Sequence, residues 1–192
     1  MQKSTFTWLF VIISSLFFSP FAQGQSLTAN DNGEVWQVVD HRSIKTNARR
    51  MVIPQKFKSY LLDVVKFKEQ LQQAPLEEKT PLSVTAATLT LPLANGKLEE
   101  FKFVESPIMD TELSNKYPTI KTYLGVSLRN PLIKARMDWT DRGFHAMITT
   151  AEETVYIDPY SRGDIKHYMS YYKNDYQALD EPHFHCEFKT ES

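Results

Sequence analysis

The sequence has a single cysteine, Cys186, so no disulfide within the chain can support the fold. It contains no glycine-rich phosphate loop, no paired Cys-x-x-Cys motif and no H-E-x-x-H motif. No serine stands in a nucleophile-elbow context. The 22 Lys and Arg residues nearly balance the 23 Asp and Glu residues, whereas a nucleic-acid or anionic-membrane partner favours a concentrated basic face. These absences predict a chain that is not an enzyme, binds no nucleic acid and carries no cofactor of its own.

The first 24 residues have the pattern of a secretory signal peptide. Lys3 gives a positive start, residues 6–18 are almost wholly apolar, and the small residues Ala22 and Gly24 precede a cleavage site before Gln25. A retained anchor is the alternative, but the apolar run is shorter than the ~20 residues of a spanning helix. We expect export by the Sec pathway to the extracellular or periplasmic space, with no stable membrane anchor after cleavage.

One long helix is expected between Pro54 and Pro75. Proline suits the first turn of a helix, and Pro75 restricts Ala74 to angles that end one. Apolar residues recur between them at helical spacing, namely Phe57, Tyr60, Leu61, Val64 and Leu71. Such an apolar stripe needs a sheet or another helix to cover it.

The period of the apolar residues changes to two after Val84, which predicts a hairpin around Asn95 and Gly96. A two-residue loop would pair Leu91 with Glu100 and place the leucines and phenylalanines on opposite faces. A three-residue loop over residues 94–96, with Gly96 left-handed, pairs Leu89 with Phe101 and is preferred. Pro92 cannot donate a ladder hydrogen bond, which favours an edge strand.

The remaining chain predicts mainly strands joined by short turns. Asp110 can cap a short helical turn, and a first short strand is expected at residues 35–39. Further strands are expected at residues 119–126, 134–140, 144–150, 154–158 and 167–172. Short connections favour antiparallel neighbours. The expected fold is therefore α+β, an antiparallel sheet of several strands with one long helix packed on it, over residues 25–180, followed by a tail at residues 181–192.

Three potential metal ligands cluster in that tail, His183, His185 and Cys186. Imidazole and thiolate groups bind zinc or copper. In an extended segment, however, Cys186 points away from the two histidines, and no second ligand pair appears elsewhere. An exposed polar tail is therefore favoured for the histidines, while Cys186 could be a free thiol offered to the metal of another molecule.

The other polar candidates have simple structural explanations. His145 lies between two apolar residues of an expected strand and is expected to be buried and hydrogen-bonded. Asp138, Asp158 and Asp164 flank turns, where a carboxylate can accept backbone hydrogen bonds. Four tyrosines and two lysines near the end form an aromatic patch that could face a protein partner, at Tyr168, Tyr171, Tyr172, Tyr176, Lys166 and Lys173. Arg49 and Arg50 are either a processing site or a solvated pair.

Several runs, in this order, resemble the N-terminal pro-domain of secreted bacterial zinc metalloproteases of the reprolysin-like (adamalysin) type. The runs are Glu105–Met109, Tyr117–Tyr123, Gly143–Ile148 and Val155–Tyr160, together with the segment ending at Pro75 and the hairpin around Asn95. The resemblance covers about residues 34–188. In that family a zinc protease domain follows, whereas this chain ends at Ser192, so no proteolytic activity carries over to these residues.

The resemblance implies a secreted pro-domain that inhibits a zinc protease or assists its folding, in cis or in trans. In related zymogens a cysteine thiolate occupies the open zinc position, which blocks the activation of water. Cys186 stands at a plausible place for that ligand, and the zinc belongs to the partner. A free-standing exported domain that binds a protein or a peptide is the alternative, and a small metal-binding protein that uses residues 183–186 is the third.

Overall fold

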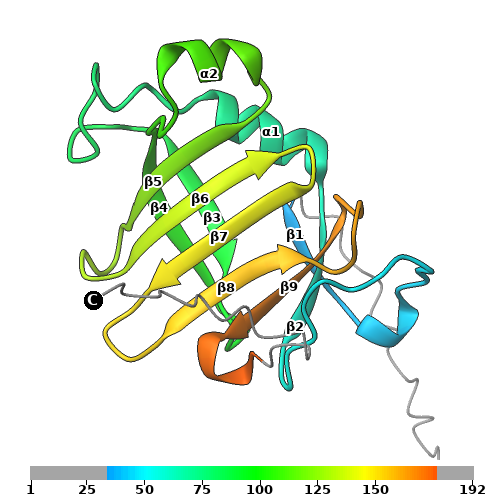
Figure 1. Cartoon of the computed structure of the whole chain (residues 1–192). Helices are drawn as coiled ribbons and strands as arrows, with labels where there is room; N and C mark the ends of the chain where they lie inside the picture. The colour runs from blue at the N-terminus through cyan, green and yellow to red at the C-terminus, as the bar shows by residue number, and fades with distance from the viewer. Residues whose placement is uncertain (1–33, 177–192) are drawn as a thin grey trace, which may run out of the picture. The chain divides into compact units, whose positions relative to one another are not determined.

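The computed structural model describes residues 34–176, which lie within one compact unit (Figure 1). Nine strands form one curled antiparallel sheet in the order β1-β2-β9-β8-β7-β6-β5-β4-β3. The strands are β1 (Trp36–Val39), β2 (Lys58–Leu62), β3 (Thr88–Pro92), β4 (Leu98–Glu105), β5 (Lys121–Ser127), β6 (Lys134–Thr140), β7 (Gly143–Thr149), β8 (Thr154–Pro159) and β9 (His167–Tyr172). The helices are short: α1 (Val64–Gln72), α2 (Thr111–Lys116) and the 3-10 turns η1 (His41–Ser43) and η2 (Lys173–Asp175).

The curl brings the two ends of the sheet together. The indole Nε1 of Trp36 on β1 donates to the carbonyl of Thr90 on β3 at 2.8 Å, although these strands are the two edges of the sheet. Ser170 of β9 likewise donates from Oγ to the carbonyl of Pro92 at 2.9 Å. These contacts satisfy polar groups that an open sheet would leave unpaired.

The inner face of the curled sheet carries the main core. Its centre is a set of aromatic rings: the Phe67 ring lies 4.7 Å from that of Phe144 and 5.3 Å from that of Trp36. Tyr168 joins them at 5.4 Å from Trp36. Helix α1 contributes Phe67 and Leu71, both buried, and so closes one end of the curl. The fold buries its apolar side chains inside one bent sheet.

The long helix expected between Pro54 and Pro75 is wrong, and with it the α+β class. Residues 58–62 form β2, which pairs with β1 on one side and β9 on the other. The helix starts only after Asp63, whose carboxylate accepts the N–H of Lys66 at 3.1 Å. Tyr60 and Leu62 point into the core from a strand, so the apolar spacing reflected two successive elements and not one helix.

The hairpin of β3 and β4 confirms the three-residue loop. Leu89 pairs with Phe101, and the N–H of Leu93 donates to the carbonyl of Lys97 at 2.8 Å, which leaves residues 94–96 as the loop. Gly96 has a φ of 91°, a conformation that favours glycine. Strand β3 ends the sheet, as Pro92 predicted.

The expected strands of the second half are confirmed within two residues at each end. The first short strand is also present, and it lies at the other edge of the sheet. Asp110 caps α2 by accepting the N–H of Leu113 at 2.8 Å. Between Glu34 and Tyr176, no helix has the length and the apolar composition that crossing a bilayer requires.

Candidate functional site

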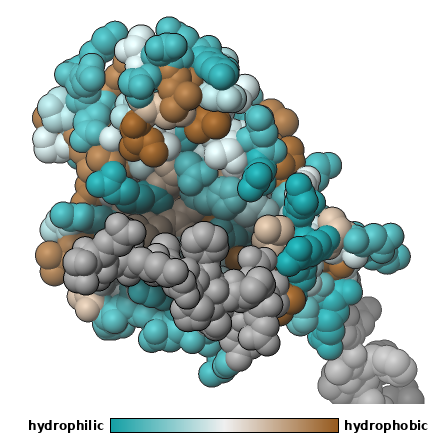
Figure 2. Space-filling model, viewed as in Figure 1, coloured by the Kyte–Doolittle hydropathy of each residue, from teal (hydrophilic) through white to brown (hydrophobic). Residues whose placement is uncertain are grey.

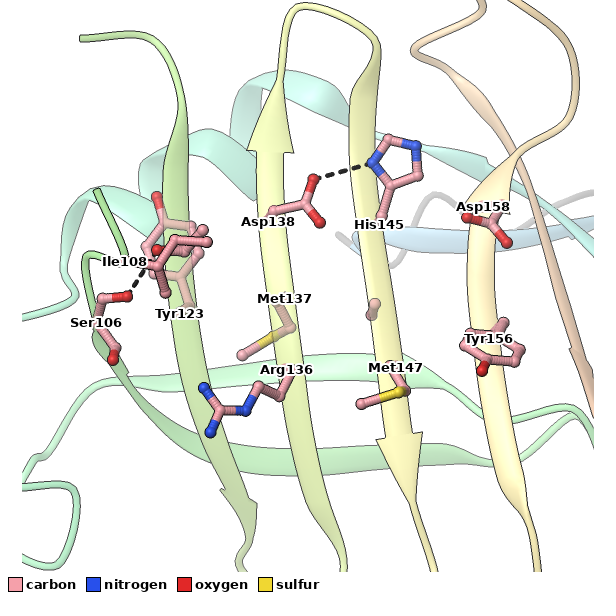
Figure 3. A pocket seen from close by; sticks show the side chains of 12 residues that line it. Ser106, Ile108, Tyr123, Arg136, Met137, Asp138, His145, Met147, Tyr156 and Asp158 are labelled. Carbon is pink, nitrogen blue, oxygen red and sulfur yellow. Dashed lines mark hydrogen bonds and ion pairs between the residues drawn. The ribbon is translucent and has the colours of Figure 1, made fainter. Parts of the chain in front are cut away.

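A groove of about 430 Å³ crosses the outer face of the sheet, the face opposite the main core (Figure 3). It extends from the segment after β4 over β5, β6 and β7 to β8. On β7 the side chains of Phe144 and Ala146 are buried, whereas those of His145 and Met147 face the groove. We call this feature the outer groove.

A histidine and an aspartate form the polar centre of the outer groove. Asp138 and His145 are directly opposite in the β6–β7 ladder, and the Nδ1 of His145 lies 3.0 Å from Oδ1 of Asp138 (Figure 3). This hydrogen bond to a carboxylate raises the pKa of His145, although burial opposes the effect. The imidazole therefore keeps its proton to a higher pH than a free histidine.

A second carboxylate lies on the next strand, where β8 presents Asp158 beside His145. Burial raises the pKa of Asp158, while the hydroxyl of Tyr171, which donates to Oδ2 at 2.6 Å, opposes the rise. The pKa of Tyr171 is raised in turn, because burial and the nearby carboxylate both disfavour a phenolate. Asp138, His145 and Asp158 therefore form a row across three neighbouring strands.

A second hollow of about 410 Å³ shares His145 and Asp158 with the outer groove. Its other walls include Arg142 from the β6–β7 turn and Arg162 from the loop after β8. The guanidinium groups of Arg136, Arg142 and Arg162 make no ion pair with any residue from Glu34 to Tyr176. The two hollows thus meet at a row of charged groups bordered by arginines.

The rest of the outer groove is largely apolar. Ile108, in the segment between β4 and α2, is 76 % exposed and Met147 is 39 % exposed. The ring of Tyr156 continues this lining on β8. Nearby, Leu113 of α2 and Tyr117 are also exposed, and Figure 2 shows hydrophobic residues among hydrophilic ones on this part of the surface. Apolar side chains left in solvent beside a hollow are typical of a binding surface.

The predicted metal ligands lie outside the described residues. This applies to His183, His185 and Cys186 in the tail, and also to the cleavage site at Gly24 and Gln25. Within residues 34–176, no group of three or more His, Cys, Asp or Glu side chains is arranged to hold a metal ion. The row of Asp138, His145 and Asp158 is therefore not a metal centre in this arrangement.

The predicted turn role is wrong for two of the three aspartates. Asp138 lies inside β6 and Asp158 inside β8, where both carboxylates bind side chains and not turn backbone. Asp164 is as expected: it accepts the N–H groups of Lys166 and His167. His145 is hydrogen-bonded but only half-buried, and its place in the groove was missed. The alternation of β6, β7 and β8 could have shown that these three side chains share one face.

Ser106 also lines the outer groove, but it cannot act with His145 as a nucleophile and base. Its N–H donates to the carbonyl of Thr122 at 2.8 Å, so Ser106 lies beside β5 on the side away from β6. Three strand spacings, roughly 14 Å, therefore separate it from His145 on β7. A nucleophile and its base need to be within hydrogen-bond reach.

The aromatic patch expected near the end of the described chain is mostly buried. Tyr168 and Tyr171 are covered, the former in the main core and the latter in a small outer-face cluster with Met169 and Tyr160. Tyr172 is half-buried and only Tyr176 is exposed. The expected tyrosine surface for a protein partner is therefore wrong.

Arg50 is not simply a solvated residue. Its guanidinium lies over the rings of Tyr160 and Phe57, at 4.5 and 5.1 Å from their centroids. The carbonyl of Arg49 accepts the N–H of Arg162 at 3.0 Å. Both arginines are thus held against the domain, which does not favour a processing site.

Comparisons with protein-family models, curated proteins and solved structures found no match.

Proposed function

We propose that this domain is a non-catalytic binding domain of the pro-domain type, which holds a polypeptide segment in the outer groove and acts on a zinc metalloprotease. One observation carries this proposal. The four runs that resemble the protease pro-domain lie apart in the sequence, but each contributes residues to the lining of the outer groove. These residues are Ser106 and Ile108, Thr122 and Tyr123, His145 and Met147, and Tyr156 and Asp158, in the order of the runs.

The chemistry of the groove favours binding over catalysis. His145 binds Asp138 through Nδ1, and Asp158 accepts a hydrogen bond from the hydroxyl of Tyr171. The serine that lines the groove is too far from the imidazole to be activated by it. An open groove with exposed apolar walls and a polar centre instead suits an extended peptide, whose backbone and side chains can use both.

Inhibition of a zinc protease tests the proposal. The DNA that follows the Ser192 codon, or a neighbouring gene, identifies a candidate protease; the mature chain from Gln25 is then added to that enzyme while peptide hydrolysis is measured. We expect inhibition, and we expect Ile108→Asp to weaken it by about tenfold, ~1.4 kcal/mol, because a carboxylate would replace an apolar contact. Leu132→Asp is the matched control, since Leu132 is 68 % exposed but does not line the groove.

The same assay tests the proposed part of Cys186. If its thiolate occupies the open zinc position of the protease, Cys186→Ser weakens inhibition and a fusion with the protease loses latency. Equal latency of both forms would remove that role and leave groove binding intact. Two results would overturn the main proposal: Ile108→Asp inhibiting as well as the unchanged chain, or the isolated chain hydrolysing peptides by itself.

A further inference from the structure

We propose that the polypeptide held in the outer groove is the chain's own segment 177–185, which leads to Cys186. This inference rests on the proposed function of the groove and names its occupant. It is drawn from the place where the described chain ends, from the charges that border the groove and from the composition of the segment.

The described chain ends close to the outer groove. Strand β9 lies beside β8, and Tyr172 pairs with Val155 near the start of β8. The following turn η2 is fixed there, because the N–H of Asn174 donates to Oε1 of Glu153 at 3.1 Å and the carbonyl of Asp175 accepts the N–H of Gln55 at 2.8 Å. Tyr156 of the groove is one residue along β8 from Val155, so the exit point and the groove share a strand.

The segment beyond Tyr176 is long enough to cross the groove. Nine residues, 177–185, span up to about 30 Å when extended. The groove runs from β8 to the segment on the far side of β5, roughly 19 Å at four strand spacings. The reach therefore allows a direct path over β8, β7 and β6.

The charges of the segment and of the groove border are complementary. Residues 177–185 carry the acidic pair Asp180 and Glu181 and no lysine or arginine. Arg136 and Arg142 border the two hollows and have no ion pair with any other described residue. The groove also contains two acidic residues, Asp138 and Asp158, which would repel an acidic segment. This repulsion is weakened because Asp138 is paired with His145 and because burial raises the pKa of Asp158.

The apolar residues of the segment also match the groove. Leu179 and Phe184 flank the acidic pair Asp180 and Glu181. Exposed apolar walls at Ile108 and Met147 offer them contacts that water does not. With residues 177–185 in the groove, Cys186 would follow directly after the bound part. Binding of that part would hold the thiol in place for contact with a partner.

The single cysteine allows a direct test in the mature chain. A nitroxide attached to Cys186 broadens the NMR signals of nearby methyl groups, and its reduced form is the reference. We expect the methyl signals of Met147 and Ile108 to lose most of their intensity, while those of Val65 on α1 keep theirs. Arg136→Glu combined with Arg142→Glu should restore the groove signals, whereas Arg129→Glu, a change of an exposed arginine outside the groove, should not.

Three results would overturn the inference: unbroadened Met147 and Ile108 signals, equal broadening at Val65, or broadening unaffected by the double arginine substitution. Failure here is distinct from failure of the proposed function. If the segment does not dock but the chain still inhibits a zinc protease in a manner sensitive to Ile108→Asp, the groove binds a segment of the partner.

Discussion

The inner and outer faces of the same strands differ in the burial and the interactions of their side chains. On the inner face, Phe144 and its neighbours are fully buried and are held by ring contacts. On the outer face, His145 and Asp138 are half-exposed and are held by one hydrogen bond. Successive residues of one strand thus belong to two environments. The inner face carries the main core, whereas the outer groove contributes few buried contacts to the domain.

Adjacent residues of β7 give the sharpest test of this difference. Phe144→Ala should cost about 3 to 5 kcal/mol, since it removes a buried ring and leaves a cavity. His145→Ala should cost no more than about 1 kcal/mol, because its partner Asp138 remains accessible to water. Urea unfolding of both variants checks the comparison. Similar losses for the two would show that the outer face also supports the fold.

The closure of the inner face by the two edge strands can be tested at Trp36. Trp36→Phe keeps an aromatic ring but removes the donor to the Thr90 carbonyl. We expect a loss of about 1 to 3 kcal/mol, from an unsatisfied carbonyl and a smaller ring. Hydrogen exchange of the β1 and β3 amides should increase more than that of β6 and β7. Uniform exchange would indicate that the edges do not depend on this contact.

The smallest expected effect concerns the hydrogen bond of the outer face. Because Asp138 raises the pKa of His145 above 6.5, the charged imidazole stabilises the fold. That contribution is complete below pH 6.5 and is lost as the pH rises through the folded-state pKa. Asp138→Asn should lower the pKa of His145, as an NMR titration can measure, and should flatten the fall in unfolding free energy above pH 6.5. An unchanged titration curve would show that the pair is not formed.

Much of the fold could be predicted from local pattern. The strands of residues 134–140 and 167–172, the loop at residues 94–96 and the cap at Asp110 all follow from short-range chemistry. The error between Pro54 and Pro75 has a physical cause. Tyr60 and Leu62 are buried through β1 and through β9, whose residues lie more than 100 positions away. The spacing of apolar residues in a short segment fits both the helical and the strand period, so it cannot show which of the two such distant contacts will favour.

The outer groove was harder to predict than the strands that form it. The sequence predicts a turn position for Asp138 and Asp158 and a buried position for His145, whereas the ladders place all three side chains in one row. Only registers between β6, β7 and β8 bring these side chains together.

The amino-acid sequence by itself determined most strands of the second half, the turn of the β3–β4 hairpin and the cap at Asp110, because these depend on neighbours within a few residues. Only the tertiary structure decided that residues 58–62 form a strand, that the edges β1 and β3 meet through Trp36, and that the outer groove exists. Those features depend on pairing between distant segments, whose free energy is gained when the sheet closes as a whole.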